Sequence, residues 1–155
     1  MKRTTQIRTL ILTLFLLFAT IPASAVERPF ALSGSGVATL IVNDQGIPVG
    51  ANATGSGTAT HLGQWTVTGN PKYTLDDQGV LHSSGEATLI AANGDKLFIQ
   101  IDGILDPVAG VDQGVFHFLG GTGRFQGASG NAQFVVNINP VTGGFDLTVV
   151  GKIDY

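Results

Sequence analysis

The hydrophobic residues after position 25 alternate as they do in β-strands and nowhere show the spacing of a helix. In the stretch LFIQIDGIL one face carries the aliphatic residues Leu97, Ile99, Ile101 and Leu105. The opposite face carries Phe98, Gln100, Asp102 and Ile104. Because successive side chains of a strand point to opposite faces of a sheet, this pattern predicts half-buried strands. The stretches AQFVVNI and GFDLTVVGKI alternate in the same way.

Clusters of turn-forming residues divide the chain into short strands. The clusters NDQGIPVG, DDQG, ANGD, DPVAGVDQG and NPVTGG gather Gly, Pro, Asn and Asp, which favour turns. Asn93 and Gly94 suit a tight type I′ hairpin, because both residues tolerate positive φ. Eight strands are expected between these breaks, at 30–42, 50–60, 64–75, 79–92, 95–105, 113–119, 124–138 and 144–154. The tripeptide 61–63 is either a turn or the middle of a longer strand.

Eight sequential antiparallel strands predict an all-β fold, a single closed β-barrel. Closure into a barrel removes the exposed strand edges, and an eight-stranded barrel has an interior that side chains fill or that holds one small ligand. A two-sheet sandwich is the alternative. The barrel domain is expected to span residues 26–155, a length that can bury a sufficient core as one domain.

The first 25 residues have the pattern of a signal peptide. Lys2, Arg3 and Arg8 precede the apolar run LILTLFLLFA, and Ala23 and Ala25 form a small-x-small cleavage site. The apolar run is too short to cross a hydrocarbon core, which needs about 20 residues. We therefore expect cleavage after Ala25, a secreted or periplasmic protein, and no membrane span in the mature chain.

Charge and residue usage exclude several partners. Three of the eight basic residues precede position 26, which leaves five against eleven acidic residues and a net charge of −6. This balance argues against nucleic acid and anionic lipid as partners, because both attract basic surfaces. The chain has no cysteine and three scattered histidines. Neither a disulfide nor a metal site nor any other cofactor is therefore expected.

The glycine-rich stretch GGTGRFQGASG, residues 120–130, is interpreted as a turn and not as a nucleotide-binding loop. A phosphate-binding loop needs a Lys and a following helix, and a dinucleotide fingerprint also leads into a helix. Here the following residues ASGNAQFVVNI alternate with period two. The prediction is a turn at Gly120–Gly123 between the strands 113–119 and 124–138.

The same region carries a family resemblance. FLGGTGRFQGASGNAQF resembles the glycine hairpin of the allene oxide cyclase and dirigent barrels. ATHLGQWTVTG and TLIAANGDKL are similar to stretches of an uncharacterised secreted bacterial branch that shares this barrel. The resemblance implies an eight-stranded antiparallel barrel, a homo-oligomer that is commonly a trimer, and a central cavity for a small hydrophobic molecule.

The resemblance does not supply catalytic residues. Plant allene oxide cyclases use a cavity glutamate, and the two glutamates here, Glu27 and Glu86, stand in no matching context. Dirigent proteins use cavity aspartates and arginines, to which Asp102 and Arg124 correspond by residue type alone. The catalytic residues, if there is a reaction, are unknown at this stage.

Three candidate ligand-binding residues lie within predicted strands. His117 would be a hydrogen-bonding or acid–base group if Val115, His117 and Leu119 faced the cavity, and otherwise it faces solvent or a neighbouring strand. Gln100 and Asp102 would be polar groups in an apolar pocket if their face were the inner one. If that face is the outer one, both side chains are solvated.

Three further candidates lie near turns or in the predicted core. Arg124 would bind an anionic ligand at the barrel mouth, or would pair with an acid of the adjoining loop, with Asp112 as a candidate. His61 either caps a turn or touches a ligand. Trp65 is expected in the core as a plug of the barrel, with stacking on a ligand as the alternative.

The leading interpretation is a secreted barrel that holds a small hydrophobic molecule without a cofactor. One alternative is a cofactor-independent cyclase or isomerase, and the other is a structural or surface-interaction module with a filled interior. A cavity with an inward ionisable group favours the enzyme, and a cavity without polar groups favours a carrier. A solidly packed interior favours the structural module.

Overall fold

The computed structural model describes residues 26–155, so the predicted signal peptide lies outside the described residues. This part of the chain forms nine strands and one short 3-10 helix. They are β1 (Arg28–Val42), β2 (Pro48–Ala59), β3 (Gly63–Gly69), β4 (Lys72–Leu75), β5 (Leu81–Ala91), β6 (Lys96–Asp106), β7 (Val111–Gly121), η1 (Gly123–Phe125), β8 (Ser129–Ile138) and β9 (Gly144–Asp154).

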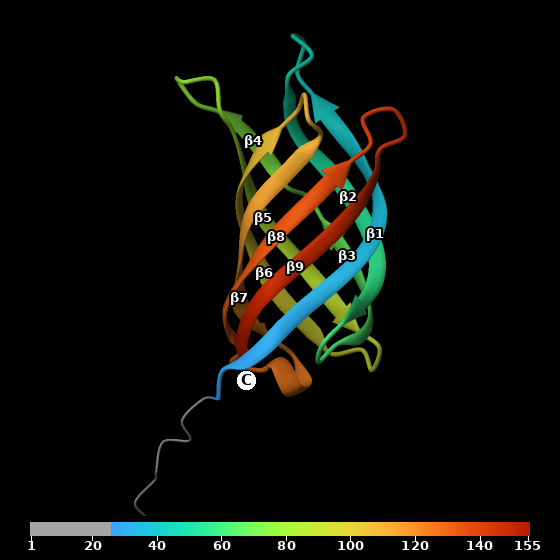
Figure 1. Cartoon of the computed structure of the whole chain (residues 1–155), viewed down its shortest axis with the longest axis vertical. Coiled ribbons are helices and arrows are strands. Elements are labelled where there is room, and N and C mark those ends of the chain that lie inside the picture. The colour runs from blue at the N-terminus through green and yellow to red at the C-terminus, as the bar shows by residue number, and fades with distance from the viewer. Residues whose placement is uncertain (1–25) are drawn as a thin grey trace, which may run out of the picture.

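The strands close into one antiparallel barrel, as predicted (Figure 1). Apart from β3 and β4, which do not pair with each other, strands that are consecutive in the chain are paired, and β1 pairs with both β2 and β9 to complete the ring. β3 and β4 together fill a single place between β2 and β5. The barrel therefore has eight strand positions, and the sandwich alternative is not formed.

The predicted strand 64–75 is divided into β3 and β4. The break falls at Asn70 and Pro71, between the end of β3 and the start of β4. Proline has no backbone N–H to donate to a neighbouring strand, so it interrupts the ladder. After the break, β4 pairs with β5 along its whole length and with β2 through one residue pair, Gly50 with Lys72.

The predicted strand 124–138 begins later than expected, at Ser129. Residues Gly123–Phe125 form η1, and the preceding glycines 120 and 121 are the last residues of β7. Positive φ occurs at Gly120 (97°) and Gly123 (57°). β7 runs to Gly121, two residues beyond the predicted end at residue 119, so the turn follows later than predicted. The side chain of Phe125 is fully buried against the end of the barrel. Burial of this aromatic ring explains why the chain folds inward here before it resumes as a strand.

One end of the barrel, which we call the closed end, is packed with aromatic side chains. It comprises both termini of the domain, the β2–β3 and β5–β6 turns, and η1 (Figure 1). Trp65 lies in this core with 2% of its surface exposed. A side chain at Gly34 would collide with the Trp65 ring, and further toward the mouth one at Gly36 would lie 2.6 Å from the ring of Phe145. These inward glycines leave the space that the large rings fill.

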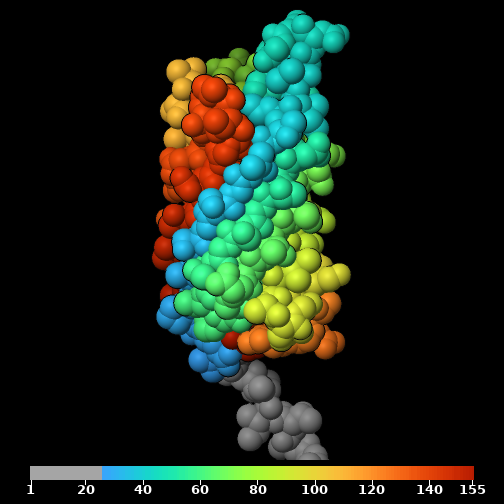
Figure 2. Space-filling view, turned by 90° about the vertical axis from the view of Figure 1, so that its right-hand side faces the viewer, coloured from blue at the N-terminus to red at the C-terminus, as the bar shows by residue number. Residues whose placement is uncertain are grey.

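The opposite end, which we call the mouth end, carries the four loops 43–47, 76–80, 107–110 and 139–143 (Figure 1). The β1–β2 hairpin rises beyond the other loops, as Figure 2 also shows. At each loop a side-chain oxygen accepts hydrogen bonds from backbone N–H groups of the loop. The acceptors are Oδ1 of Asn43, Asp76, Asp106 and Asn139. Each loop is therefore held in a defined turn.

No helix within residues 26–155 has the length and hydropathy needed to cross a membrane.

Candidate functional site

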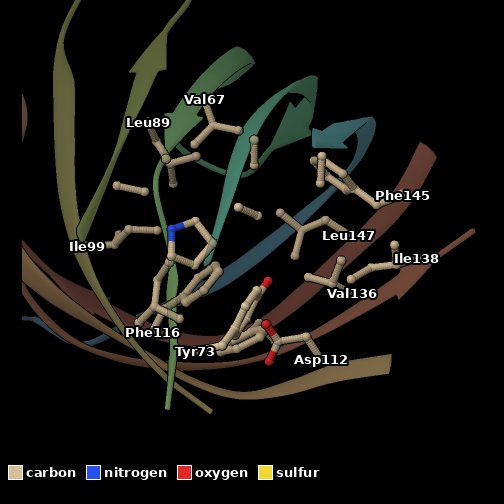
Figure 3. Close-up of a pocket in the computed structure, with 18 residues that line it drawn as sticks. Val67, Tyr73, Leu89, Ile99, Asp112, Phe116, Val136, Ile138, Phe145 and Leu147 are labelled. Carbon is tan, nitrogen blue, oxygen red and sulfur yellow. The ribbon is translucent and has the colours of Figure 1, made fainter. Parts of the chain in front are cut away.

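An apolar cavity lies inside the barrel between the packed closed end and the mouth loops (Figure 3). Its volume is about 90 Å³, counted as the space open to the centres of water-sized molecules. Strands from all sides of the barrel supply the walls. The lining residues are Ala38, Ala51, Ala53, Val67, Gly69, Pro71, Tyr73, Ala87, Leu89, Ile99, Ile101, Asp112, Phe116, Phe134, Val136, Ile138, Phe145 and Leu147.

The inner faces of the strands confirm most of the predicted alternation. Leu97, Ile99, Ile101 and Leu105 are buried. Ala132 and Phe134 of the stretch AQFVVNI and Phe145 and Leu147 of the stretch GFDLTVVGKI are buried as well. Their side chains meet in the core because each stands on the inner side of a pleated strand. The central cavity is therefore bordered by the residues that the sequence pattern placed on one face.

One polar cluster, Tyr73, Ser83 and Asp112, lies at the cavity. Tyr73 and Asp112 line it, and Ser83 binds Asp112 without lining it. The Ser83 hydroxyl donates a hydrogen bond to Oδ1 of Asp112 at 2.7 Å, and both residues are buried. Ser83 reaches Asp112 over Gly103, since a side chain at Gly103 would lie 2.7 Å from the Ser83 Oγ. Tyr73 is the cross-strand partner of Ser83. Its hydroxyl points into the cavity, and the Asp112 carboxyl lies beside its ring (Figure 3).

Burial changes the acidity of both ionisable groups in this cluster. Burial raises the pKa of the Asp112 carboxyl, and the hydrogen bond from Ser83 opposes this shift in part. Burial, together with the negative charge of Asp112, raises the pKa of Tyr73 to about 12. Tyr73 is therefore a neutral hydrogen-bond donor at physiological pH. Asp112 keeps its proton to a higher pH than an ordinary carboxyl does.

Three of the predicted site residues lie on the outer wall. Gln100 and Asp102 are exposed on the outer face of β6, so they do not line the cavity. His117 also faces outward, with Nδ1 at 2.6 Å from Oδ1 of Asn131 on β8.

Two neighbouring phenylalanines explain why His117 lies outside. Phe116 stacks on Phe134 with ring centroids 4.4 Å apart, and Phe118 meets Phe30 edge-on at 4.9 Å. Both faces of this strand are apolar in sequence, and the face with the larger aromatic area is the one that is buried.

The other three predicted residues lie at the closed end. Arg124 forms an ion pair with Asp95, at 3.3 Å between Nε and Oδ2. The expected ion pair with an acid is formed, but Asp112 is not the partner, because it points into the barrel from the β7 end nearest the mouth loops. His61 adopts positive φ (67°) in the β2–β3 turn, with Nε2 at 2.9 Å from the Pro29 carbonyl. Trp65 lies in the packed core. The structure thus brings none of the six predicted residues into the cavity wall.

The sequence analysis missed the polar cluster, although one signal was present. Residues 112, 114, 116 and 118 alternate with 113, 115, 117 and 119, so an inward Phe116 implies an inward Asp112. The same rule places Ser83 beside the inward residues Leu81 and Leu89. For Tyr73 the signal was also present, because alternation counted along the predicted strand 64–75 places it on the same face as Trp65 and Val67.

Within residues 26–155, no three side chains of His, Asp or Glu lie close enough together to hold a metal ion.

Comparison with known proteins identifies the fold. A solved structure described as that of the pterocarpan synthase dirigent protein GePTS1 is similar, with a TM-score of 0.55 and 16% sequence identity. The similarity covers 85% of this chain and 93% of that chain. No family model matches the sequence, and no curated protein matches it either. The chain therefore has a dirigent-like barrel fold.

Proposed function

We propose that this dirigent-like barrel binds a small hydrophobic molecule in its central cavity. The observation that carries the proposal is an apolar cavity with a single polar cluster, Tyr73, Ser83 and Asp112. Small-ligand sites usually have this makeup, in which apolar walls provide affinity and a few polar groups fix orientation. The dirigent-like fold and the resemblance to the uncharacterised secreted bacterial branch both support a role in binding.

The polar cluster favours a neutral ligand with a hydroxyl or carbonyl group. Tyr73 offers a hydrogen-bond donor, and Asp112 offers a donor when protonated and an acceptor when ionised. The cavity wall in the described structure contains no Lys, Arg or His. An anionic ligand would therefore lack a counter-charge and would meet the charge of Asp112 in a site of low dielectric constant.

A cofactor-independent cyclase or isomerase is the second candidate function. Its specific support is Asp112, an ionisable group with a raised pKa that faces the cavity. Such a carboxyl can give or take a proton at a higher pH than an ordinary aspartate does, while Tyr73 donates a hydrogen bond to an oxygen that gains negative charge. A cavity that holds a flexible molecule in one conformer also lowers the barrier to ring closure. The allene oxide cyclase resemblance and the neighbour's description as a pterocarpan synthase support this candidate.

The structural module with a filled interior has the weakest support of the three. The closed end is solidly packed, but the half of the barrel toward the mouth contains the cavity.

Native mass spectrometry of the protein purified from its own source tests the proposal. We expect an additional small mass that is released on denaturation. Tyr73→Phe and Asp112→Asn should lose most of this mass, whereas Asp102→Asn on the outer wall should retain it. A spectrum of the bare polypeptide for all four proteins would contradict the proposal. If the released molecule is converted by the wild type and is bound but not converted by Asp112→Asn, the protein is an enzyme.

We also propose a secreted or periplasmic location and a homo-oligomer, with a trimer as the form that the resemblance implies. The signal-peptide pattern of residues 1–25 supports export. Exposed valines on the outer faces of β8 and β9, Val135 and Val150, support association. The same native spectrum reports the number of subunits, and an exported chain should begin at Val26.

A further inference from the structure

The barrel wall has a seam between β2 and β4 near the mouth end. One residue pair, Gly50 with Lys72, joins these two strands. From that pair toward the mouth, β2 continues to pair with β1, and β4 pairs with β5. The two strand edges that face each other across the seam are therefore not joined by further ladder pairs in the described structure.

An apolar groove of about 550 Å³ occupies this seam, and we call it the seam groove. The β1–β2 hairpin supplies one side, and β4 with the β4–β5 and β6–β7 loops supplies the other. Its lining residues are Gly46, Ile47, Pro48, Leu75, Gly79, Val80, Leu81, Leu105, Asp106 and Pro107. The single charged member, Asp106, uses Oδ1 to accept hydrogen bonds from the backbone of Val108 and Ala109.

The seam groove borders the polar cluster of the central cavity. Leu75 follows Tyr73 by two positions on the same strand, and Leu81 precedes Ser83 by two positions. Leu105 is the cross-strand partner of Asp112. The layer of side chains that lines the groove is therefore the next layer of the barrel beyond Tyr73, Ser83 and Asp112.

The two volumes differ in a way that constrains the ligand. Sites for small organic ligands usually enclose about 300–1,000 Å³. The central cavity, at about 90 Å³, is smaller than that range, so a ligand of that size has to extend beyond it, and the seam groove adds an open apolar hollow of about 550 Å³ on the mouth side. The groove residues Leu75 and Leu81 lie two strand positions from Tyr73 and Ser83, so a ligand with its polar group on the cluster needs only a short tail to reach the groove.

Building on the proposed function, we propose that the seam groove is the second half of the ligand site. The ligand is then elongated, with its polar group at Tyr73 and Asp112 and an apolar tail in the groove. Leu75 is expected to contact the tail, because it lines the groove and lies two positions after Tyr73 on β4.

Calorimetric binding of phenol, 4-butylphenol and 4-octylphenol tests this arrangement. For the wild-type protein we expect the Kd to fall with tail length, by roughly fourfold for each methylene that enters the groove. Leu75→Asp should keep the phenol Kd within about twofold of the wild type and should abolish most of the gain from the tail. Leu75 is 48% exposed, so the added charge is tolerated by the fold.

Val141→Asp is the matched control, since it adds the same charge to another mouth loop at a residue that is 91% exposed and outside the groove. It should retain the full dependence on tail length. The inference is wrong if the wild-type Kd does not depend on tail length, or if Leu75→Asp retains that dependence as the control does. If no compound binds, or if Tyr73→Phe leaves every Kd unchanged, the proposed function itself fails.

Discussion

Asp112 is the residue that determines the charge of the cavity wall. It is a buried carboxyl whose hydrogen bond comes from a neutral serine, and the cavity wall around it contains no cationic side chain. A buried charge without a partner destabilises a folded protein, so burial favours the protonated form. A stability measurement can therefore detect the raised pKa without knowledge of the ligand.

Asp112→Asn is expected to gain stability relative to the wild type as the pH rises above 3.8, the ordinary pKa of the carboxyl. The folded carboxyl has a pKa above the ordinary value of 3.8 and binds its proton more tightly than the unfolded one. Between these two pKa values the wild-type free energy of unfolding falls with rising pH, by at most about 1.4 kcal/mol per pH unit. The asparagine at this position does not titrate, so the variant does not lose this free energy of unfolding as the pH rises.

Urea unfolding of both proteins at several pH values measures this difference, with the exposed Asp102→Asn as a control for net charge. A constant difference between Asp112→Asn and the wild type over this range would show that Asp112 is not desolvated.

At the scale of elements, the end of β7 shows how glycine acts inside a strand. Gly121 was expected in a turn with positive φ, yet it is a paired residue of β7 opposite Leu97. A side chain at Gly121 would collide with the Lys96 carbonyl and would lie 2.8 Å from Cβ of Phe125. Close packing of η1 against the β6–β7 pair, and not a special backbone angle, thus requires glycine here.

Gly121→Ala should lower the free energy of unfolding by roughly 1–3 kcal/mol, as overpacked sites do. Gly144→Ala at the start of β9 is the matched comparison, because its nearest neighbour is the Thr142 Oγ1 at 3.3 Å, and it should change stability by less than about 1 kcal/mol. Equal effects of the two substitutions in chemical denaturation would count against the packing of η1 described here.

At the scale of the whole molecule, the two ends of the barrel differ in packing and in charge. Four of the five basic residues of the described chain lie near the closed end, namely Arg28, Lys96, Arg124 and Lys152. The mouth loops carry the aspartates 44, 76, 77 and 106. The aromatic core occupies the closed end, whereas the cavity and the seam weaken the wall toward the mouth. Local stability should follow this division.

Hydrogen exchange should therefore be fastest, among strand amides, along the seam edge of β4. The Asp76 amide donates a hydrogen bond to the Val80 carbonyl, so the Asp76 amide points toward β5. In an antiparallel ladder every second amide points to the same side, so the amides of Tyr73 and Leu75 point away from β5 and toward the seam. Ile99 and Ile101 on β6, which has a neighbour on each side, should exchange much more slowly. Equal protection of these two pairs would mean that the seam is closed in solution.

The sequence by itself determined the strands, the closed barrel and the inner faces of β6, β8 and β9. These features follow from a period of two and from turn residues, which act between neighbours in the chain and can be counted without a partner strand. The wrong boundaries fall where tertiary packing competes with that pattern, at Pro71 and at the buried ring of Phe125.

Tertiary structure alone decided the site. Both faces of β7 are apolar, so alternation could not choose between Phe116 and His117, and stacking on Phe134 from β8 made the choice. That choice turned Asp112 inward and His117 outward. Tyr73, Ser83 and Asp112 come from three strands and meet through register across the glycine of a fourth, a relation that no local pattern records.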